Sequence, residues 1–296
     1  MNKKLLFIYN PKAGRGTINS HVGDVVDIFT KKGYEVTVYP TQYRGDAEDK
    51  ARQRACDFDR IVVSGGDGTL DEVVTGIMDT DFNSTIGYIP SGSTNDFAGS
   101  LRIPKTIKKA AQIAVCGKDF LCDVGHFNDR YFVYVAAFGL FTDVTYETDQ
   151  NLKNMFGYAA YLAEAVKRLK SLESIPLTVT YDGNVIKDNF LVGMITNSNS
   201  VGGIKGITGR NVELDDGLFE VLLVKTPATL MELNLIPPAI LDRKIKSDCI
   251  ISFKCSEIQV ESDTPISWTL DGEFGGDVDK ALIRNLKGRL NISIDT

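Results

Sequence analysis

The sequence lacks the marks of several protein classes. None of its apolar runs approaches the roughly 18–20 residues that a membrane-spanning helix needs. It has only two histidines, neither beside a Gly-x-Ser-x-Gly or a cysteine nucleophile motif, so a serine or cysteine hydrolase is not expected. Its five cysteines fit no zinc-binding spacing, and the Gly-Lys-Ser/Thr ending of a Walker A loop is absent.

The composition is that of a globular protein. A chain of 296 residues allows one large domain or two of ordinary size. Acidic residues outnumber basic ones, 39 to 33, and the net charge of −6 argues against nucleic acid as the main partner. The apolar run Leu5–Tyr9 is too short for a signal peptide and ends at Asn10-Pro11, so we expect a cytoplasmic protein.

The first 122 residues alternate predicted strands and helices. The strands are expected at Leu5–Asn10, Glu35–Tyr39, Arg60–Ser64 and Ile86–Ile89, and the helices at Asn19–Lys32, Asp46–Ala55, Leu70–Met78 and Ile107–Val115. This alternation predicts an α/β domain, residues 1–122, with a parallel sheet and helices on both faces. Ligands of such sheets bind at the carboxyl ends of the strands.

Strands dominate residues 123–296, with one predicted helix at about Leu152–Leu169. The strands are expected at Asp119–Gly125, Arg130–Phe138, Leu177–Tyr181, Phe190–Thr196, Leu218–Lys225, Ile250–Phe253, Ser256–Glu261 and Ile266–Leu270. This pattern predicts a mainly antiparallel β-sandwich as a second domain, with room for the last residues to return to the first. No long linker separates the two, so we expect them to pack around a cleft.

The most specific motif is Gly65-Gly66-Asp67-Gly68-Thr69, directly after a predicted strand. Glycines let backbone N–H groups approach a phosphate closely, and the helix expected from Leu70 adds its positive N-terminal dipole. Thr69 can cap that helix or bind a phosphate oxygen. The acid Asp67 fits such a loop mainly through Mg²⁺ or water. The alternative is a tight structural turn.

Two more loops follow strands and point to the same edge of the sheet. Asn10–Gly16 offers Lys12 and Arg15 to offset triphosphate charge, although an ordinary strand-to-helix turn explains it as well. Pro90–Asp96 offers the hydroxyls of Ser91, Ser93 and Thr94 to ribose or phosphate, with helix capping by Asn95 or Asp96 as the alternative.

Two acidic turns lie in the second half. Glu213–Phe219 contains Asp215-Asp216, whose hard oxygen donors suit Mg²⁺ or Ca²⁺, whereas a solvated Asx turn is the alternative. Leu270–Glu273 carries an Asp-Gly turn that would fix the direction of Glu273. A carboxylate there could accept a hydroxyl proton during phosphoryl transfer, or it could be an exposed hairpin residue.

These motifs, in this order, resemble the diacylglycerol kinase catalytic-domain family, and the nearest look-alikes are soluble bacterial diacylglycerol and related lipid kinases. The glycine-aspartate loop alone is shared with NAD kinases and phosphofructokinases, whose fold the first lobe is expected to share. The Leu-Asp-Asp-Gly and Asp-Gly-Glu motifs select lipid kinases, and Tyr146-Glu147-Thr148 also fits the family.

The resemblance implies an ATP-dependent, Mg²⁺-dependent lipid kinase that converts diacylglycerol to phosphatidic acid. Glu273 would be the general base, Asp67 would organise the catalytic Mg²⁺, and Asp216 with the carbonyls of Glu213 and Leu218 would hold a structural Mg²⁺. The ATP-binding residues would be Asn10, Pro11, Lys12, Ala13, Gly14, Thr41, Gly65, Gly66, Asp67, Gly68, Thr69, Leu70, Asp71, Ser93 and Thr94.

Two positions depart from the family pattern. Asp71 stands where the family usually has Asn, which places an extra carboxylate near the phosphates, and Ser93 replaces a Thr but keeps the hydroxyl. A soluble-substrate kinase of the NAD kinase type, which shares the glycine-aspartate loop, stays open as the alternative enzyme. A nucleotide-binding regulatory protein without turnover, with Asp71 as the inactivating change, also stays open.

A lipid substrate would bring the protein to the inner face of the membrane as a peripheral enzyme. The candidate contacts are Arg15, the patch Lys167-Arg168/Lys170 and the patch Arg243-Lys244/Lys246, although solvated helix faces explain such basic clusters equally well. A homodimer is also possible.

Overall fold

The computed structural model describes residues 3–139, 166–207, 209, 212–242 and 244–295. The predicted motif Tyr146–Thr148 and most of the predicted helix Leu152–Leu169 lie outside them. Within the described part of the chain, no helix is long and apolar enough to cross a membrane.

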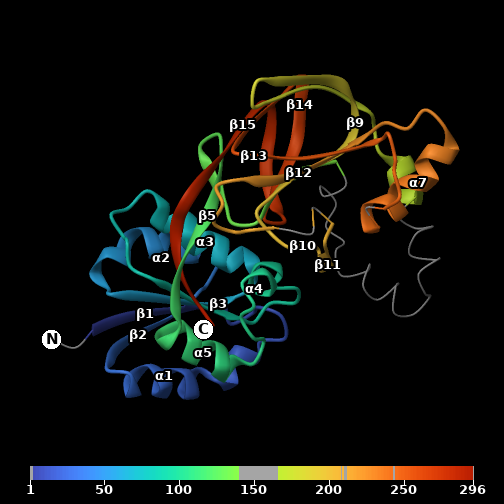
Figure 1. Ribbon diagram of the computed structural model, residues 1–296. Coiled ribbons are helices and arrows are strands. Elements are labelled where there is room, and N and C mark those ends of the chain that lie inside the picture. Colours follow the sequence, from blue (N-terminus) through green and yellow to red (C-terminus); the bar gives the residue numbers. More distant parts are fainter. Residues whose placement is uncertain (1–2, 140–165, 208, 210–211, 243, 296) are drawn as a thin grey trace.

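Four parallel strands form the centre of the first lobe. They are β1 (Lys3–Tyr9), β2 (Tyr34–Pro40), β3 (Arg60–Gly65) and β4 (Ile86–Pro90), in the spatial order β2-β1-β3-β4. Helices α2 (Asp46–Arg54) and α3 (Asp67–Met78) cover one face, and α1 (Val22–Lys31) and α5 (Ile107–Cys116) cover the other (Figure 1). The short elements η1 (Thr17–Ser20), η2 (Ala55–Asp57) and α4 (Asp96–Ser100) complete this lobe.

The second lobe is built mainly from antiparallel strands. They are β5 (Lys118–Phe127), β6 (Arg130–Phe132), β7 (Val135–Phe138), β8 (Ile175–Tyr181), β9 (Asn184–Thr196), β12 (Phe219–Lys225), β13 (Ile250–Cys255), β14 (Glu257–Leu270) and β15 (Glu273–Ile294). A separate hairpin, β10 (Ser200–Val201) and β11 (Ile204–Lys205), and helix α7 (Leu230–Leu241) lie beside them. The tight turn predicted at Asp182-Gly183 is confirmed, with positive φ at both residues.

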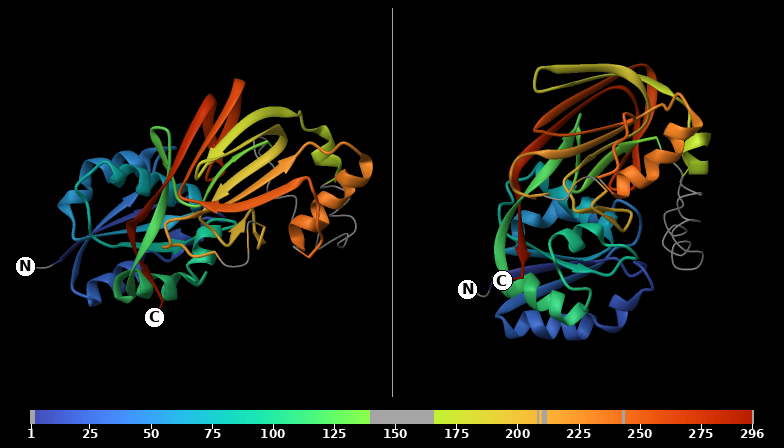
Figure 2. Two further views of the ribbon diagram at one scale, coloured as in Figure 1. Left: turned by 45° about the horizontal axis from the view of Figure 1, so that its top comes forward. Right: turned by 45° about the vertical axis from the view of Figure 1, so that its right-hand side comes forward.

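The long strand β15 joins the two lobes. It pairs with β14 in the second lobe and ends in the first, where Ile292 aligns with Ile86 of β4 in parallel. Figure 2 shows this strand running from one lobe into the other beside β5. A single sheet therefore extends through both lobes.

Each lobe has its own apolar core. Leu5, Phe7, Val62 and Ile89 belong to the first, and Trp268, Phe138 and Phe219 belong to the second. At roughly 25 cal/mol per Å² of apolar surface, burying such side chains is the main stabilising contribution in each lobe.

Several sequence-based element bounds are wrong. Helix α3 begins at Asp67, three residues earlier than predicted, so Thr69 lies inside the helix and is not its cap. The predicted strand Arg130–Phe138 is interrupted at Val133-Tyr134, and the two strands predicted over Ser256–Leu270 form one continuous β14. Neither β15 nor α7 was predicted.

Candidate active site

Three loops meet at the carboxyl ends of β1, β3 and β4. The amide of Asn10 donates to the carbonyl of Ser64 (2.8 Å), and the amide of Ser91 donates to the carbonyl of Gly65 (2.8 Å). The Asn10 side-chain amide also donates to Thr69 Oγ1 (3.3 Å), which ties the first loop to α3. The loops therefore form one connected edge, as expected for parallel strands.

Glycines allow these loops to pack in direct contact. A Cβ built on Gly14, whose φ is +55°, would lie 2.5 Å from the carbonyl oxygen of Ser91. A Cβ on Gly92 would lie 2.4 Å from Gly66 Cα. Because both neighbours are backbone, a side chain at either position would push the loops apart.

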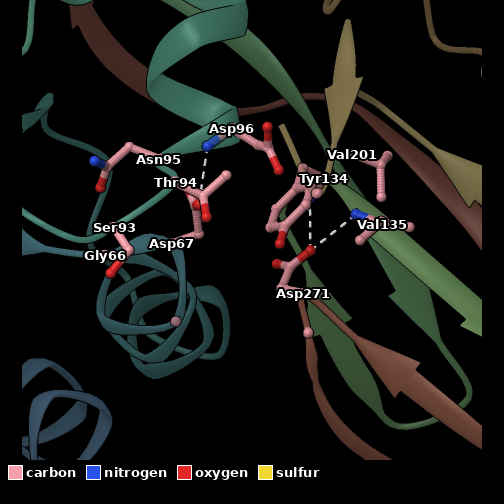
Figure 3. A pocket seen from close by; sticks show the side chains of 13 residues that line it. Gly66, Asp67, Ser93, Thr94, Asn95, Asp96, Tyr134, Val135, Val201 and Asp271 are labelled. Carbon is pink, nitrogen blue, oxygen red and sulfur yellow. Dashed lines mark hydrogen bonds between the residues drawn. The ribbon is translucent and has the colours of Figure 1, made fainter. Parts of the chain in front are cut away.

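A pocket of about 210 Å³ lies between this edge and the second lobe (Figure 3). The first lobe contributes the glycine loop and the Ser93–Asp96 loop, and the second contributes the β6–β7 connection, the β10–β11 hairpin and the β14–β15 turn. The lining residues are Gly66, Asp67, Gly68, Ser93, Thr94, Asn95, Asp96, Tyr134, Val135, Val201, Gly202, Asp271 and Gly272.

Asp67 is the first residue of α3, and its carboxylate accepts hydrogen bonds from the N-terminus of α4. The backbone amides of Asp96 (2.9 Å) and Phe97 (3.2 Å) donate to it, and Figure 3 shows the first of these bonds. Burial raises its pKa to about 7, and the nearby Asp96 and Asp271 carboxylates add to the rise. Asp67 is therefore buried and bonded to backbone amides, and its expected role in organising Mg²⁺ stays a prediction.

Asp96 connects the first lobe to the second. Its buried carboxylate accepts a hydrogen bond from Ser200 Oγ (2.6 Å) and another from the amide of Gly203 (3.0 Å), both in the β10–β11 hairpin. Asn95 bonds the backbone of Gly92 with its side chain and makes no side-chain cap. The Ser93–Asp96 loop is thus fixed from both sides.

Asp271 is buried at the β14–β15 turn. Its carboxylate accepts three consecutive backbone amides, from Val133 (2.5 Å), Tyr134 (2.9 Å) and Val135 (2.8 Å). These bonds explain the break between β6 and β7, since the amides turn toward the carboxylate. They also fix the turn that carries Glu273.

Glu273 lies next to the glycine loop although about two hundred residues separate them in the chain. A Cβ on Gly68 would lie 3.7 Å from Glu273 Oε1. The Glu273 carboxylate pairs with the guanidinium of Arg44 at 2.5 Å, and both side chains are more than half exposed. The carboxylate therefore faces solvent at the edge of the pocket.

The acidic turn Glu213–Leu218 lies away from this pocket. Asp216 accepts the amide of Leu218 (2.9 Å) and pairs with the ammonium of Lys254 (3.0 Å), which also pairs with Glu220 (2.9 Å). Across the described residues, no three His, Cys, Asp or Glu side chains are grouped to hold a metal. The Mg²⁺ site expected at Asp216 with the carbonyls of Glu213 and Leu218 stays a prediction, and we route no reaction step through a metal there.

The structure brings most of the predicted ATP-binding residues to one edge of the sheet but not all of them to its surface. Leu70 is wholly buried in the first core, and Thr41 is buried with its amide bonded to the carbonyl of Tyr9. Asp71 contacts Asp271 in the interior. Lys12 and Arg15 are exposed on the first loop.

Sequence reasoning missed several residues of this region. Asp96 was considered only as a cap, Asp271 only as part of a turn, and Arg44, Tyr134 and Val201 not at all. The Asn-Asp pair after a serine-rich loop and the Asp-Gly turn were the available signals. Arg44 had none, because its partner Glu273 is distant in the sequence.

Comparisons with known proteins match nearly the whole chain. Residues 4–127 match the model of the diacylglycerol kinase catalytic domain, and residues 135–292 match that of the YegS C-terminal NAD kinase β-sandwich-like domain. The chain is 34% identical to a diacylglycerol kinase of Bacillus subtilis (strain 168), over 93% of this chain and 91% of that protein. It is 33% identical to one of Staphylococcus carnosus (strain TM300), over 99% and 95%. A crystal structure of a candidate diacylglycerol kinase from Bacillus anthracis str. Sterne superposes with a TM-score of 0.83 at 27% identity, covering 99% and 98% of the two chains.

Proposed function

The chain belongs to the diacylglycerol kinase family, and from this premise we propose that it transfers the γ-phosphoryl group of ATP to the free hydroxyl of diacylglycerol, giving phosphatidic acid. The family resemblance drawn from the motifs is thereby confirmed, and the chain is a lipid kinase. A kinase of this family uses ATP as its substrate.

One observation carries the proposal: a carboxylate from the second lobe, Glu273, stands beside the glycine loop of the first. Phosphoryl transfer needs hydrogen-bond donors that stabilise the negative charge of the phosphates, a positioned acceptor hydroxyl, and a group that takes the proton of that hydroxyl. The backbone amides of Gly66 and Gly68, at the N-terminus of the twelve-residue helix α3, supply donors and a favourable dipole.

The proposed reaction places the lipid hydroxyl between Glu273 and the γ-phosphate. Glu273 accepts the hydroxyl proton while the new phosphorus–oxygen bond forms and the bond to ADP breaks. Arg44, paired with Glu273, is available to the phosphate oxygens as charge develops on them. ATP enters as its Mg²⁺ chelate, so the metal of this step arrives with the substrate.

In this proposal the first lobe binds the nucleotide, and the second lobe supplies the base and contacts the lipid. Residues 1–122 bind the nucleotide through the loops at Asn10–Gly14, Gly65–Thr69 and Ser93-Thr94. Residues 123–296 supply the base and the wall of the pocket formed by Tyr134, Val135 and Val201, which the lipid headgroup would contact. The end of β15 belongs spatially to the first lobe, because Ile292 pairs with Ile86.

We further propose that helix α7 approaches the membrane. Its inward face packs through Leu233 and Ile236, yet its outward face is apolar too: Leu230 and Met231 are 68% and 76% exposed. Such exposed apolar side chains are unusual on one helix and suit insertion at a lipid interface. The exposed Lys244 and Lys246 follow this helix and favour an anionic surface.

The test is transfer of label from γ-labelled ATP to diacylglycerol in detergent micelles, compared with NAD as acceptor. Glu273→Gln should lower kcat by about 10²–10⁴-fold, the usual size of a general-base contribution, and change KM for ATP little. Glu257→Gln is the matched control, because the Glu257 side chain is 54% exposed, close to the 53% of Glu273, and also pairs with an arginine, Arg284 (2.6 Å). A kcat of Glu273→Gln within about threefold of the wild-type value would show that Glu273 is not the base. Label found on NAD but not on lipid would refute diacylglycerol as the substrate.

A further inference from the structure

Two buried carboxyl groups meet between α3 and the β14–β15 turn. Asp71 lies one helical turn after Asp67, and Asp271 lies two residues before Glu273. The two side chains are within hydrogen-bonding contact, although two hundred positions separate them in the chain. Two carboxylates cannot bond each other unless one of them carries a proton.

The surroundings decide which carboxyl group carries the proton. Asp271 accepts three backbone amides, which stabilise its ionised form. By contrast, no donor among the described residues reaches Asp71 Oδ1, which is buried from solvent. An ionised Asp71 would thus be desolvated and unpaired, whereas a protonated Asp71 gains a charge-assisted bond to Asp271.

We propose that Asp71 is a protonated positioning residue whose carboxyl group donates a hydrogen bond to Asp271 and thereby holds the Gly272–Glu273 turn over the glycine loop. This inference rests on the proposed role of Glu273 as the base. Asp71 itself touches no reacting atom. It couples the helix that begins in the phosphate loop to the turn that carries the base.

The charged groups around the pair oppose a second negative charge. Glu48 of α2 and Glu72 of α3 face Asp71, and Asp67 faces Asp271. Two of the surrounding carboxylates have cations of their own: Arg52 pairs with Glu48 and Arg44 with Glu273. Burial first, then Asp271, raises the pKa of Asp71 well above its ordinary value, while the pKa of Asp271 rises only to about 6.

Rising pH should therefore weaken the contact. A carboxyl group whose pKa is raised by folding stabilises the native state at low pH, and this contribution is lost as pH rises toward the folded-state pKa. When Asp71 finally loses its proton, it repels Asp271 and the turn carrying Glu273 is released. An asparagine at position 71 would keep a donor at every pH, and a leucine would have none.

The experiment compares wild type with Asp71→Asn, Asp71→Leu and Glu257→Gln. Infrared difference spectra at neutral pH should show a protonated carboxylic acid in wild type that is missing in Asp71→Asn. The ratio of kcat of Asp71→Asn to that of wild type should rise with pH. Asp71→Leu should lower kcat by about tenfold, the kinetic equivalent of one net hydrogen bond, with KM for ATP nearly unchanged.

Glu257→Gln is the matched control, because it removes an exposed carboxylate of β14 that pairs with Arg284; it should keep the pH profile of wild type. A wild-type spectrum without the acid band, or a kcat ratio that does not change with pH, would overturn the proposal. If Asp71→Leu fails to fold, the spectrum and the Asp71→Asn ratio still decide. A protein that transfers no phosphate to lipid would refute the proposed function, whereas the infrared band would still test the proton on Asp71.

Discussion

Replacing Gly92 with alanine tests whether the three loops form one nucleotide-binding edge. The added Cβ would lie 2.4 Å from Gly66 Cα and 2.9 Å from Asn95 Oδ1, and ordinary contact begins near 3.4 Å. The Ser91–Asn95 loop must therefore retreat by about 1 Å from the glycine loop, because Gly66 is backbone and cannot rotate away.

The magnitude follows from this overlap. Overpacking of this kind costs about 1–3 kcal/mol, which for a chain of this size corresponds to a melting temperature lowered by about 2–10 °C. A 1 Å misplacement of reacting groups can cost on the order of 10²-fold in rate, so kcat/KM for ATP should fall by about ten- to a hundredfold. Calorimetry and steady-state kinetics with diacylglycerol micelles measure both effects.

Gly99→Ala is the control, since Gly99 lies in the nearby α4 and its Cβ would meet nothing within 4 Å. It should leave kcat/KM at the wild-type value and stability equal or slightly higher. Gly92→Ala with wild-type melting and wild-type kinetics would refute the reasoning, because the loops would then tolerate separation without consequence for ATP.

Three further outcomes are expected. Between about pH 4 and 7, the free energy of unfolding of wild type should fall relative to that of Asp67→Asn, because the pKa of Asp67 is raised from 3.8 to about 7; parallel curves would contradict this. Asp216→Asn should lower the melting temperature equally in EDTA and in Mg²⁺, since it loses the Lys254 contact; a loss seen only with Mg²⁺ would instead support the predicted metal site. Met231→Asp should weaken sedimentation with phosphatidylglycerol vesicles, whereas Val185→Asp, at another exposed apolar position, should not.

The elements that the sequence predicted well are those with local signals. Strand β3 is a short apolar run, and the Gly65–Thr69 loop that follows it is distinctive in composition. Helix α7 was missed because Pro237-Pro238 suggest a break, although Thr229 and Glu232 form a capping box that marks its start. Strand β15 was missed because it carries many charged residues and because register shifts in its pairing with β14 and β5 interrupt the alternation of apolar and polar residues.

Contacts between distant segments could not be predicted in this way. The Asp-Gly turn suggested that Glu273 was directed by its neighbours, but nothing local indicated that Asp271 would bind the amides of Val133–Val135. The partner of Asp71 is likewise invisible in the sequence of α3. The order of the motifs identified the family, because motifs can be recognised from the residues alone. The geometry of the site could not be predicted in this way, because it depends on contacts between the two lobes.

Three buried acids bind the segments that line the pocket. Asp67 binds the start of α4, Asp96 binds the β10–β11 hairpin, and Asp271 binds the β6–β7 connection. Each carboxylate is buried or nearly so, and each is satisfied largely by backbone amides, which cannot be replaced by a change of side chain elsewhere. Ionised groups in such places are costly unless every acceptor is bonded. Of these contacts, only that of Asp96 ties the first lobe to the second, whereas Asp67 and Asp271 each order a segment within their own lobe. Under the proposed function, the exposed Glu273 is the carboxylate left to accept the proton of the substrate hydroxyl.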